Sequence, residues 1–242
     1  MSEKRLVWDL PLRLFHWLLV LSLLASWYTA TMSSKGEFLE FHGRSYGYAE
    51  LHFWLGYWAL GLICFRLLWG FVGPKHARFI GFVPSPARFV AYAGKFFRRD
   101  STPSVGHNPM GAAVVLLMLL MVGAQAVTGL FLVDNTDIFT APYHALVSDS
   151  TAGKLMSFHH FNFKLLQWIV VLHVVAILFY HVYKRQNLIG AMLTGRKDME
   201  LVPAAEAISG SQLFKALIVA LLAAGIVWLV LSQAPPPPAL GD

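Results

Sequence analysis

The stretch HHFNFKLLQWIVVLH, residues 159–173, is followed by the apolar run VVAILFYHVY, residues 174–183. The mostly apolar residues 165–183 approach the roughly 20 residues that a helix needs to cross the hydrocarbon core of a bilayer. His159 and His173 are separated by fourteen positions, which on a helix leaves their side chains about 40° apart in direction and about 21 Å apart in depth. One membrane-spanning helix therefore offers two imidazoles on one face, one in each leaflet.

Four more apolar stretches surround this one. The predicted spans are about residues 14–31, 51–72, 110–133 and 157–183, with an extra span at about 213–232. Of the 242 residues, 57% are hydrophobic and 13% are charged, against roughly 25% charged in soluble domains. The sequence predicts an all-α integral membrane protein: a four-helix transmembrane bundle over residues 1–200, then a fifth C-terminal transmembrane helix and a Pro-rich tail over residues 201–242. We expect the fifth helix, which has no histidine, to be an appended anchor.

Cysteine usage and the N-terminus narrow the class further. Cys64 is the single cysteine, which excludes a disulfide framework and the C-x-x-C-H attachment of a c-type haem. No small-residue cleavage site follows the first apolar run, so we expect that span to be retained rather than removed as a signal. The net charge of +6 does not indicate a nucleic-acid partner, because the basic residues lie in loops beside the spans.

Loop charge predicts the orientation in the membrane. Three segments that lie on the same side of the predicted spans carry most of the basic residues: Lys4, Arg5, Arg13; Lys75, Arg78, Arg88, Lys95, Arg98, Arg99; and Lys184, Arg185, Arg196, Lys197. The other loops carry the acidic residues Glu37, Glu40, Asp134, Asp137 and Asp149. The positive-inside rule then predicts a cytoplasmic N-terminus and a C-terminus on the opposite side.

Each histidine of the fourth span has a predicted partner at its own depth. His52 lies near the outer start of the second span, level with His159, and His16 lies near the cytoplasmic start of the first span, level with His173. Two imidazoles at each of two depths predict two non-covalent b haems with bis-histidine iron, which suits electron transfer because no axial position is open. His160 is an alternative ligand to His159, and a lone histidine in a span also serves packing or a proton path.

Two arginines are candidates for contacts with haem propionates. Arg66 lies fourteen positions after His52, on the same inward face, where a buried cation needs an anion. Snorkelling to the cytoplasmic headgroups is the alternative for its side chain. Arg13, one turn before His16, is a similar candidate.

The remaining candidates have weaker signals. Gly56, one turn after His52, would let a porphyrin lie close to the helix, although small residues also serve plain helix packing. His181 is a candidate for a propionate contact or for taking a quinol proton, and an ordinary interfacial histidine is the alternative. The loop histidines, to which we assign no role, are His42, His76, His107 and His144.

Several motifs resemble one family. DLPLRLFHW (residues 9–17), LHFWLGYWALGLICFRLLWG (51–70) and SFHH…VLHVVAILFYH (157–181) are similar to bacterial cytochrome b561, a family that includes the b-type cytochrome subunit of nickel–iron hydrogenases. The resemblance covers roughly residues 5–200. It implies a four-helix core in the bacterial inner membrane, with two b haems on His16, His52, His159 and His173. It also implies electron exchange between the quinone pool and a partner, which we expect to be a periplasmic c-type cytochrome or hydrogenase-like protein.

Three functional hypotheses follow. The leading one is an electron-transfer subunit rather than a stand-alone enzyme. The second is a quinone-coupled oxidoreductase such as a superoxide oxidase, which needs a basic funnel beside the outer haem, whereas the outer loops are acidic. The third is a membrane transporter that uses its histidines for metal ions or protons, without haem.

Overall fold

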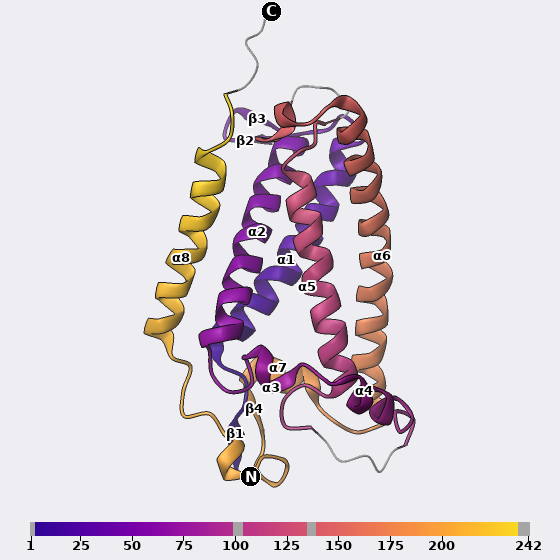
Figure 1. Ribbon diagram of the computed structural model, residues 1–242, viewed down its shortest axis with the longest axis vertical. Coiled ribbons are helices and arrows are strands. Elements are labelled where there is room, and N and C mark those ends of the chain that lie inside the picture. Colours follow the sequence, from indigo (N-terminus) through magenta and orange to yellow (C-terminus); the bar gives the residue numbers. More distant parts are fainter. Residues whose placement is uncertain (1–2, 99–103, 135–138, 237–242) are drawn as a thin grey trace, which may run out of the picture. The chain divides into compact units, whose positions relative to one another are not determined.

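Five long helices dominate the computed structural model, which describes residues 3–98, 104–134 and 139–236 (Figure 1). Arg99, Asp137 and the end of the proline tail lie outside these residues. Each of the five is long and apolar enough to cross a membrane: α1 Leu10–Ser33, α2 Tyr48–Val72, α5 Pro109–Gly129, α6 Asp149–Val182 and α8 Leu213–Ser232. The predicted all-α membrane class is confirmed.

Two helix limits differ from the predicted spans for local reasons. Helix α5 ends at Gly129 rather than near residue 133, because the amides of Leu130 and Phe131 bond to carbonyls three residues back and the chain tightens into a turn. Helix α6 begins at Asp149 rather than near residue 157. Its first turns contain polar residues, which a hydropathy signal does not register, and the Ser148 hydroxyl accepts a hydrogen bond from the Thr151 amide at its start.

Shorter elements connect the long helices. The strands are β1 Lys4–Leu6, β2 Phe38–Phe41, β3 Arg44–Gly47 and β4 Arg196–Asp198, and the short helices are α3 Phe79–Phe82, α4 Pro86–Ala93 and α7 Leu188–Thr194. Three 3₁₀ turns cover His144–Leu146, Met199–Leu201 and Ala204–Glu206. Strand β1 pairs antiparallel with β4, and β2 pairs antiparallel with β3.

The chain forms two compact units, and each of the five long helices contributes to both. Unit 1 comprises residues 1–16, 65–119 and 167–220, and unit 2 comprises residues 17–64, 120–166 and 221–242. The described residues of the three basic segments noted above belong to unit 1, and the described acidic loop residues belong to unit 2.

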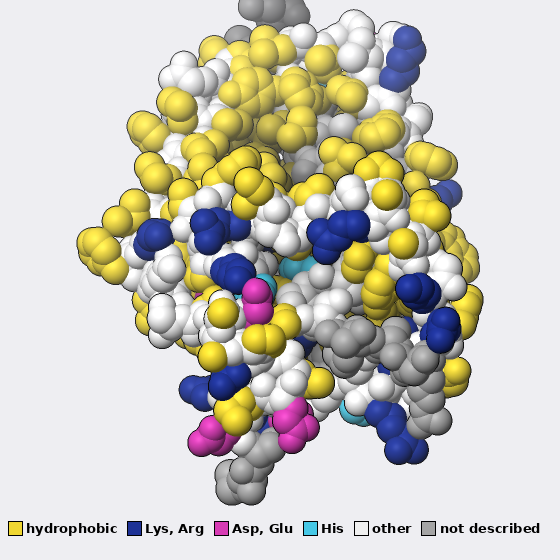
Figure 2. Space-filling model, turned by 60° about the horizontal axis from the view of Figure 1, so that its bottom comes forward, with side chains coloured by type: hydrophobic (Ala, Val, Ile, Leu, Met, Phe, Trp, Pro, Cys, Tyr) yellow, Lys and Arg dark blue, Asp and Glu magenta, His cyan; other side chains and the backbone are white. Residues whose placement is uncertain are grey.

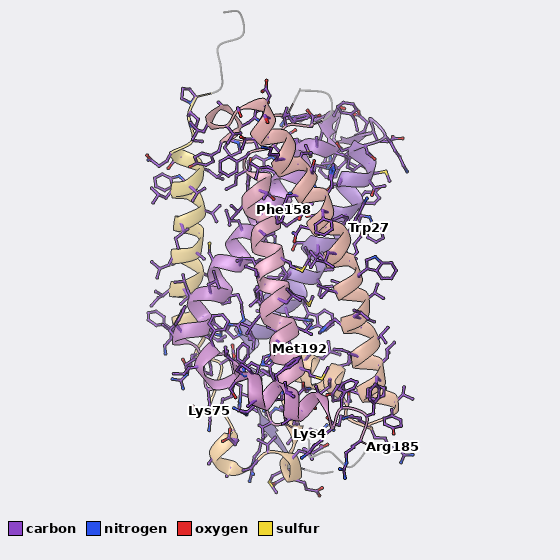
Figure 3. All side chains as sticks on the ribbon, turned by 45° about the vertical axis from the view of Figure 1, so that its right-hand side comes forward. Lys4, Trp27, Lys75, Phe158, Arg185 and Met192 are labelled. Atoms are coloured by element: carbon purple, nitrogen blue, oxygen red, sulfur yellow. The ribbon has the colours of Figure 1, made fainter. Side chains whose placement is uncertain are left out.

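Segments outside the long helices also contribute to unit 1. Strands β1 and β4 place Lys4 opposite Asp198 and Leu6 opposite Arg196, and the fully buried side chains of unit 1 include Trp69 and Val202. Figure 2 looks onto this end of the unit and shows Lys and Arg side chains gathered there, with a histidine visible between them. Figure 3 labels Lys4, Lys75 and Arg185 among them.

Unit 2 has an apolar core to which α8 contributes. Leu60, Ala126 and Leu130 form its buried centre, and Val227 and Val230 of α8 pack against it. The Tyr143 hydroxyl also donates a hydrogen bond to the Val230 carbonyl. The C-terminal half of α8 is therefore part of this core, which the expectation of an appended anchor did not include.

Candidate functional site

His52 lies in the second turn of α2, and helix α1 holds its ring. Its Nδ1 atom lies 3.0 Å from the carbonyl oxygen of Ser26 and 3.4 Å from Thr29 Oγ1. A carbonyl oxygen only accepts hydrogen bonds, so the proton of the neutral imidazole must sit on Nδ1. The lone pair of His52 Nε2 is therefore available to a metal ion.

His159 on α6 is held in a similar way by α5. Its Nδ1 atom lies 2.9 Å from Thr128 Oγ1, and that hydroxyl lies 2.8 Å from the Ala124 carbonyl oxygen in its own helix. The Thr128 hydroxyl donates to Ala124 and accepts from His159, which places the imidazole proton on Nδ1. His159 thus also keeps its Nε2 lone pair for a metal.

Buried Asn162, one turn after His159, fixes α6 against α5. Its Nδ2 atom donates to the Met121 carbonyl at 3.0 Å and to Gln125 Oε1 at 2.7 Å. Because a buried amide is costly without hydrogen-bond partners, these two bonds specify the register of the helices beside His159.

The spacing of the two rings matches a metal held between them. The centroids of the His52 and His159 rings lie 6.4 Å apart, with the ring planes at 76°. Two imidazoles on opposite sides of one metal ion, each with a bond of about 2 Å, place their ring centroids about 6 Å apart. A haem iron with two axial histidines needs this arrangement and only two protein ligands. Among the described residues, no group of three or more His, Cys, Asp or Glu side chains is arranged to bind a metal ion.

Gly56 leaves open space on the histidine-bearing face of α2. It lies four positions after His52, and a Cβ atom built on it meets no other atom within 4 Å. Gly129 is the corresponding small residue near the other ring, where an added Cβ would lie 3.6 Å from His159 Cε1. The residues of unit 2 thus fit a flat macrocycle between the two imidazoles.

Unit 1 holds the other two histidines. His16 on α1 and His173 on α6 are both half-buried, and the two rings are close enough to interact electrostatically. The structure therefore brings together the same two pairs that the helix depths predicted, one pair in each unit. Ligation of iron by these pairs stays a prediction.

Arg66 of α2 is buried in unit 1 with only 1% of its surface exposed. Its guanidinium carbon lies 4.7 Å from the centre of the Phe79 ring and 5.7 Å from that of Phe82. Neither Nη1 nor Nη2 has a hydrogen-bond partner among the described residues. The side chain is buried rather than snorkelling, and its orphaned donors fit an anionic group such as a propionate.

The other sequence candidates are placed differently. Arg13 donates from Nη1 to the Leu193 carbonyl at the end of α7, so it already has a structural partner. His160 is exposed, whereas His159 is half-buried against Thr128. His181 is exposed on unit 1.

Sequence reasoning missed Asp9, whose side chain caps the N-terminus of α1. Its Oδ1 atom accepts hydrogen bonds from the Leu12 amide at 2.9 Å and from Trp69 Nε1 at 3.0 Å. Burial raises the pKa of the Asp9 carboxyl, and these hydrogen bonds act in the opposite direction. An Asp directly before a helix that carries Pro11 at its second position is an N-cap signal that the sequence does contain.

His107 was assigned no role, and the structure places it in the core of unit 1. Its ring centroid lies 4.7 Å from that of Trp8 and 4.6 Å from that of Phe82. Burial, together with the nearby cations Arg66 and Lys197, lowers the pKa of His107 to about 3. The ring is therefore neutral at physiological pH and packs as an aromatic residue.

Comparison with known proteins identifies the family to which the chain belongs. The family model described as prokaryotic cytochrome b561 matches residues 7–195. The chain belongs to the prokaryotic cytochrome b561 family. As a cytochrome b561 it is a membrane b-type cytochrome, which implies haem b and a role in electron transport.

Relatives of this cytochrome b561 are proteins named as probable Ni/Fe-hydrogenase B-type cytochrome subunits. The protein from Rhizobium leguminosarum bv. viciae is 25% identical over 79% of this chain and 87% of its own length. The protein from Azotobacter vinelandii is 28% identical over 78% and 86%, and that from Escherichia coli K12, a hydrogenase 1 subunit by name, is 26% identical over 73% and 80%. No solved structure matches the chain significantly.

Proposed function

We propose that this cytochrome b561 carries electrons between the quinone pool and a periplasmic redox partner, using two bis-histidine b haems. His52 and His159 hold the periplasmic haem, and His16 and His173 hold the cytoplasmic one. The partner we infer is a Ni/Fe hydrogenase or a c-type cytochrome. Quinone is the membrane-soluble substrate.

The observation that supports this proposal most strongly is the His52–His159 pair. Both imidazoles donate from Nδ1 to fixed acceptors, and their centroids are 6.4 Å apart. When bound, haem supplies one-electron iron chemistry. The protein's part would be to present the two Nε2 atoms to the haem and to keep each ring in one tautomer through Ser26 and Thr128.

Charges in unit 1 support its assignment to the cytoplasmic side. Its loops contain the three basic segments, and the loops of unit 2 contain Glu37, Glu40, Asp134 and Asp149. By the positive-inside rule, unit 1 faces the cytoplasm of a bacterial inner membrane and unit 2 faces the periplasm. Arg66 in unit 1 then offers its unpartnered donors to a propionate of the cytoplasmic haem.

The partner is inferred from relatives and from charge. Three relatives bear the name of a Ni/Fe-hydrogenase cytochrome subunit, and each aligns over most of its length. A superoxide oxidase needs positive charge near the periplasmic haem to attract its anionic substrate. The acidic loops of unit 2 favour an electron-transfer subunit over that activity.

The haem scheme is tested by counting haems in matched variants. We expect a pyridine haemochrome assay to give two b haems per chain for the wild type, and one for His159→Ala and for His173→Ala. His160→Ala, a change at the exposed neighbour, should retain both. A single haem in the wild type would contradict the assignment. So would a His160→Ala variant that loses a haem while the His159→Ala variant keeps both.

The partner is tested by following haem reduction in membranes. With a hydrogenase as partner, hydrogen gas should reduce both haems, and the His159→Ala variant should block quinone reduction. Reduction by an added quinol but never by hydrogen would point to a c-type cytochrome as partner.

A further inference from the structure

A basic hollow in unit 1 lies where two membrane-spanning helices end. It has a volume of about 320 Å³ and lies between the C-terminus of α2 and the N-terminus of α8. Lys75, Arg78, Ser209, Gly210 and Lys215 are among the residues that line it. Because α2 and α8 are long enough to cross the membrane, their ends lie at the level of the lipid headgroups.

The charge around the hollow is positive. Lys75 Nζ lies 2.8 Å from Glu206 Oε1, and Lys215 Nζ donates to the Val72 carbonyl at 3.3 Å. Among the described residues, Glu206 is the one carboxylate that forms an ion pair with any of the three lining cations. One carboxylate against three cations leaves an excess of positive charge, which favours an anionic ligand.

Exposed apolar side chains are direct sequence neighbours of residues that line the hollow. Phe71 of α2 is 71% exposed, and Leu213 and Phe214 of α8 are 58% and 78% exposed. These side chains lie on spanning helices, where acyl chains are the surrounding solvent. A polar, cationic hollow directly beside an apolar surface matches a phosphate headgroup with attached acyl chains better than a free phosphate ion.

We propose that this hollow is a binding site for an anionic phospholipid, with the phosphate beside Arg78 and Lys215 and the acyl chains along the outer surfaces of α2 and α8. A lipid here would join the start of α8 to the end of α2. Basic pockets of this kind at the cytoplasmic side of membrane proteins bind acidic headgroups through charge and hydrogen bonds. The site is distinct from both histidine pairs.

Two kinds of variant test the site. Arg78→Gln with Lys215→Gln removes two cations from the hollow but leaves the Lys75–Glu206 ion pair in place. Gly210→Leu fills the hollow without removing charge, because a Cβ on Gly210 meets nothing within 4 Å. The matched control is Arg88→Gln with Lys95→Gln, which removes two exposed cations of unit 1 that do not line the hollow.

The measurement is native mass spectrometry of the purified cytochrome during titration with phosphatidylglycerol or phosphatidylcholine. We expect wild type to bind phosphatidylglycerol at least tenfold more tightly than phosphatidylcholine. The Arg78/Lys215 variant and Gly210→Leu should each lose about tenfold, with the control unchanged and the haem spectrum intact throughout.

Three results would overturn the proposal. The control losing as much affinity as the Arg78/Lys215 variant would show diffuse attraction to the basic surface. Equal binding of phosphatidylcholine would show that charge is not recognised. Competition by inorganic phosphate at matched concentration would show a free phosphate site rather than a lipid site.

Discussion

Each unit contains one pair of histidines that we propose as haem ligands, and the surroundings of the two pairs differ. In unit 2 both imidazoles donate to neutral acceptors, the Ser26 carbonyl and the Thr128 hydroxyl. Unit 1 also contains the buried guanidinium of Arg66, which we propose lies beside a propionate of the haem at His16 and His173. A hydrogen bond from Nδ1 raises ligand basicity and favours oxidised iron, whereas a buried cation favours reduced iron. Similar ligands in the two units should therefore have different redox potentials, with unit 1 the higher.

The largest expected difference between the units is the loss of one haem when one histidine of a pair is replaced. His52→Ala should remove the haem of unit 2 and leave that of unit 1, and His16→Ala should do the reverse. Redox titration of each variant should then show one of the two wild-type midpoint potentials, with the higher potential surviving in His52→Ala. If the lower potential survives in that variant, the order inferred from Arg66 and the hydrogen bonds is wrong.

The second effect comes from Arg66 alone. Arg66→Gln removes the buried positive charge of unit 1, so the higher midpoint potential should fall by about 60 mV, or about 1.4 kcal/mol for one electron. The lower potential should not move, because Arg66 lies fourteen positions after His52 on α2, about 21 Å along the helix. Arg88→Gln, which removes an exposed cation, is the control. Equal shifts in both potentials would indicate a general charge effect.

Sequence reasoning predicted the histidine pairs because helix geometry converts residue number into two quantities: the direction of a side chain around the helix and its depth in the membrane. His159 and His173 share a face of α6, and the pairs follow from which side each helix enters. The partners Ser26 and Thr128 were not predictable in this way. Their role depends on which residue of another helix comes opposite each ring, and a hydropathy pattern does not encode that register.

The elements outside the spans were missed for another reason. The β2–β3 hairpin turns at His42 and Gly43, whose φ values are +48° and +72°. Two positive φ angles in a two-residue loop are typical of a type I′ turn. The His-Gly pair is a weak signal by comparison with Asn-Gly, and windows sized for membrane spans pass over strands of four residues.

The third effect concerns pH and is specific to unit 1. His107 has a folded-state pKa of about 3, below its unfolded value of about 6.5. The unfolded chain therefore binds a proton that the folded chain does not, and stability falls as the pH drops below about 6.5. Between pH 7.5 and pH 6.0 this group should lower the stability by about 0.8 kcal/mol, and His107→Phe should abolish that part of the loss.

The measurement is the Tm of the purified haem protein at pH 7.5 and 6.0. His42→Gln, a change at an exposed histidine of unit 2, is the control and should retain the wild-type dependence. An identical pH dependence in wild type and His107→Phe would show that His107 does not stay neutral in the folded protein.

The smallest effect tests the hydrogen bond that holds His159. Thr128→Val removes the acceptor of the Nδ1 proton, which lowers ligand basicity, so the lower midpoint potential should rise by about 20 mV, or about 0.5 kcal/mol. Thr128→Ser keeps the hydroxyl and should restore the wild-type value. Thr31→Val is the matched control, because the Thr31 hydroxyl bonds to the Trp27 carbonyl of its own helix. A merely structural role for Thr128 would change haem content or Tm without moving the potential. If Thr128→Val shifts the higher potential instead, the haem held by His159 is the one with the higher potential. The order of potentials proposed for the two units would then be reversed.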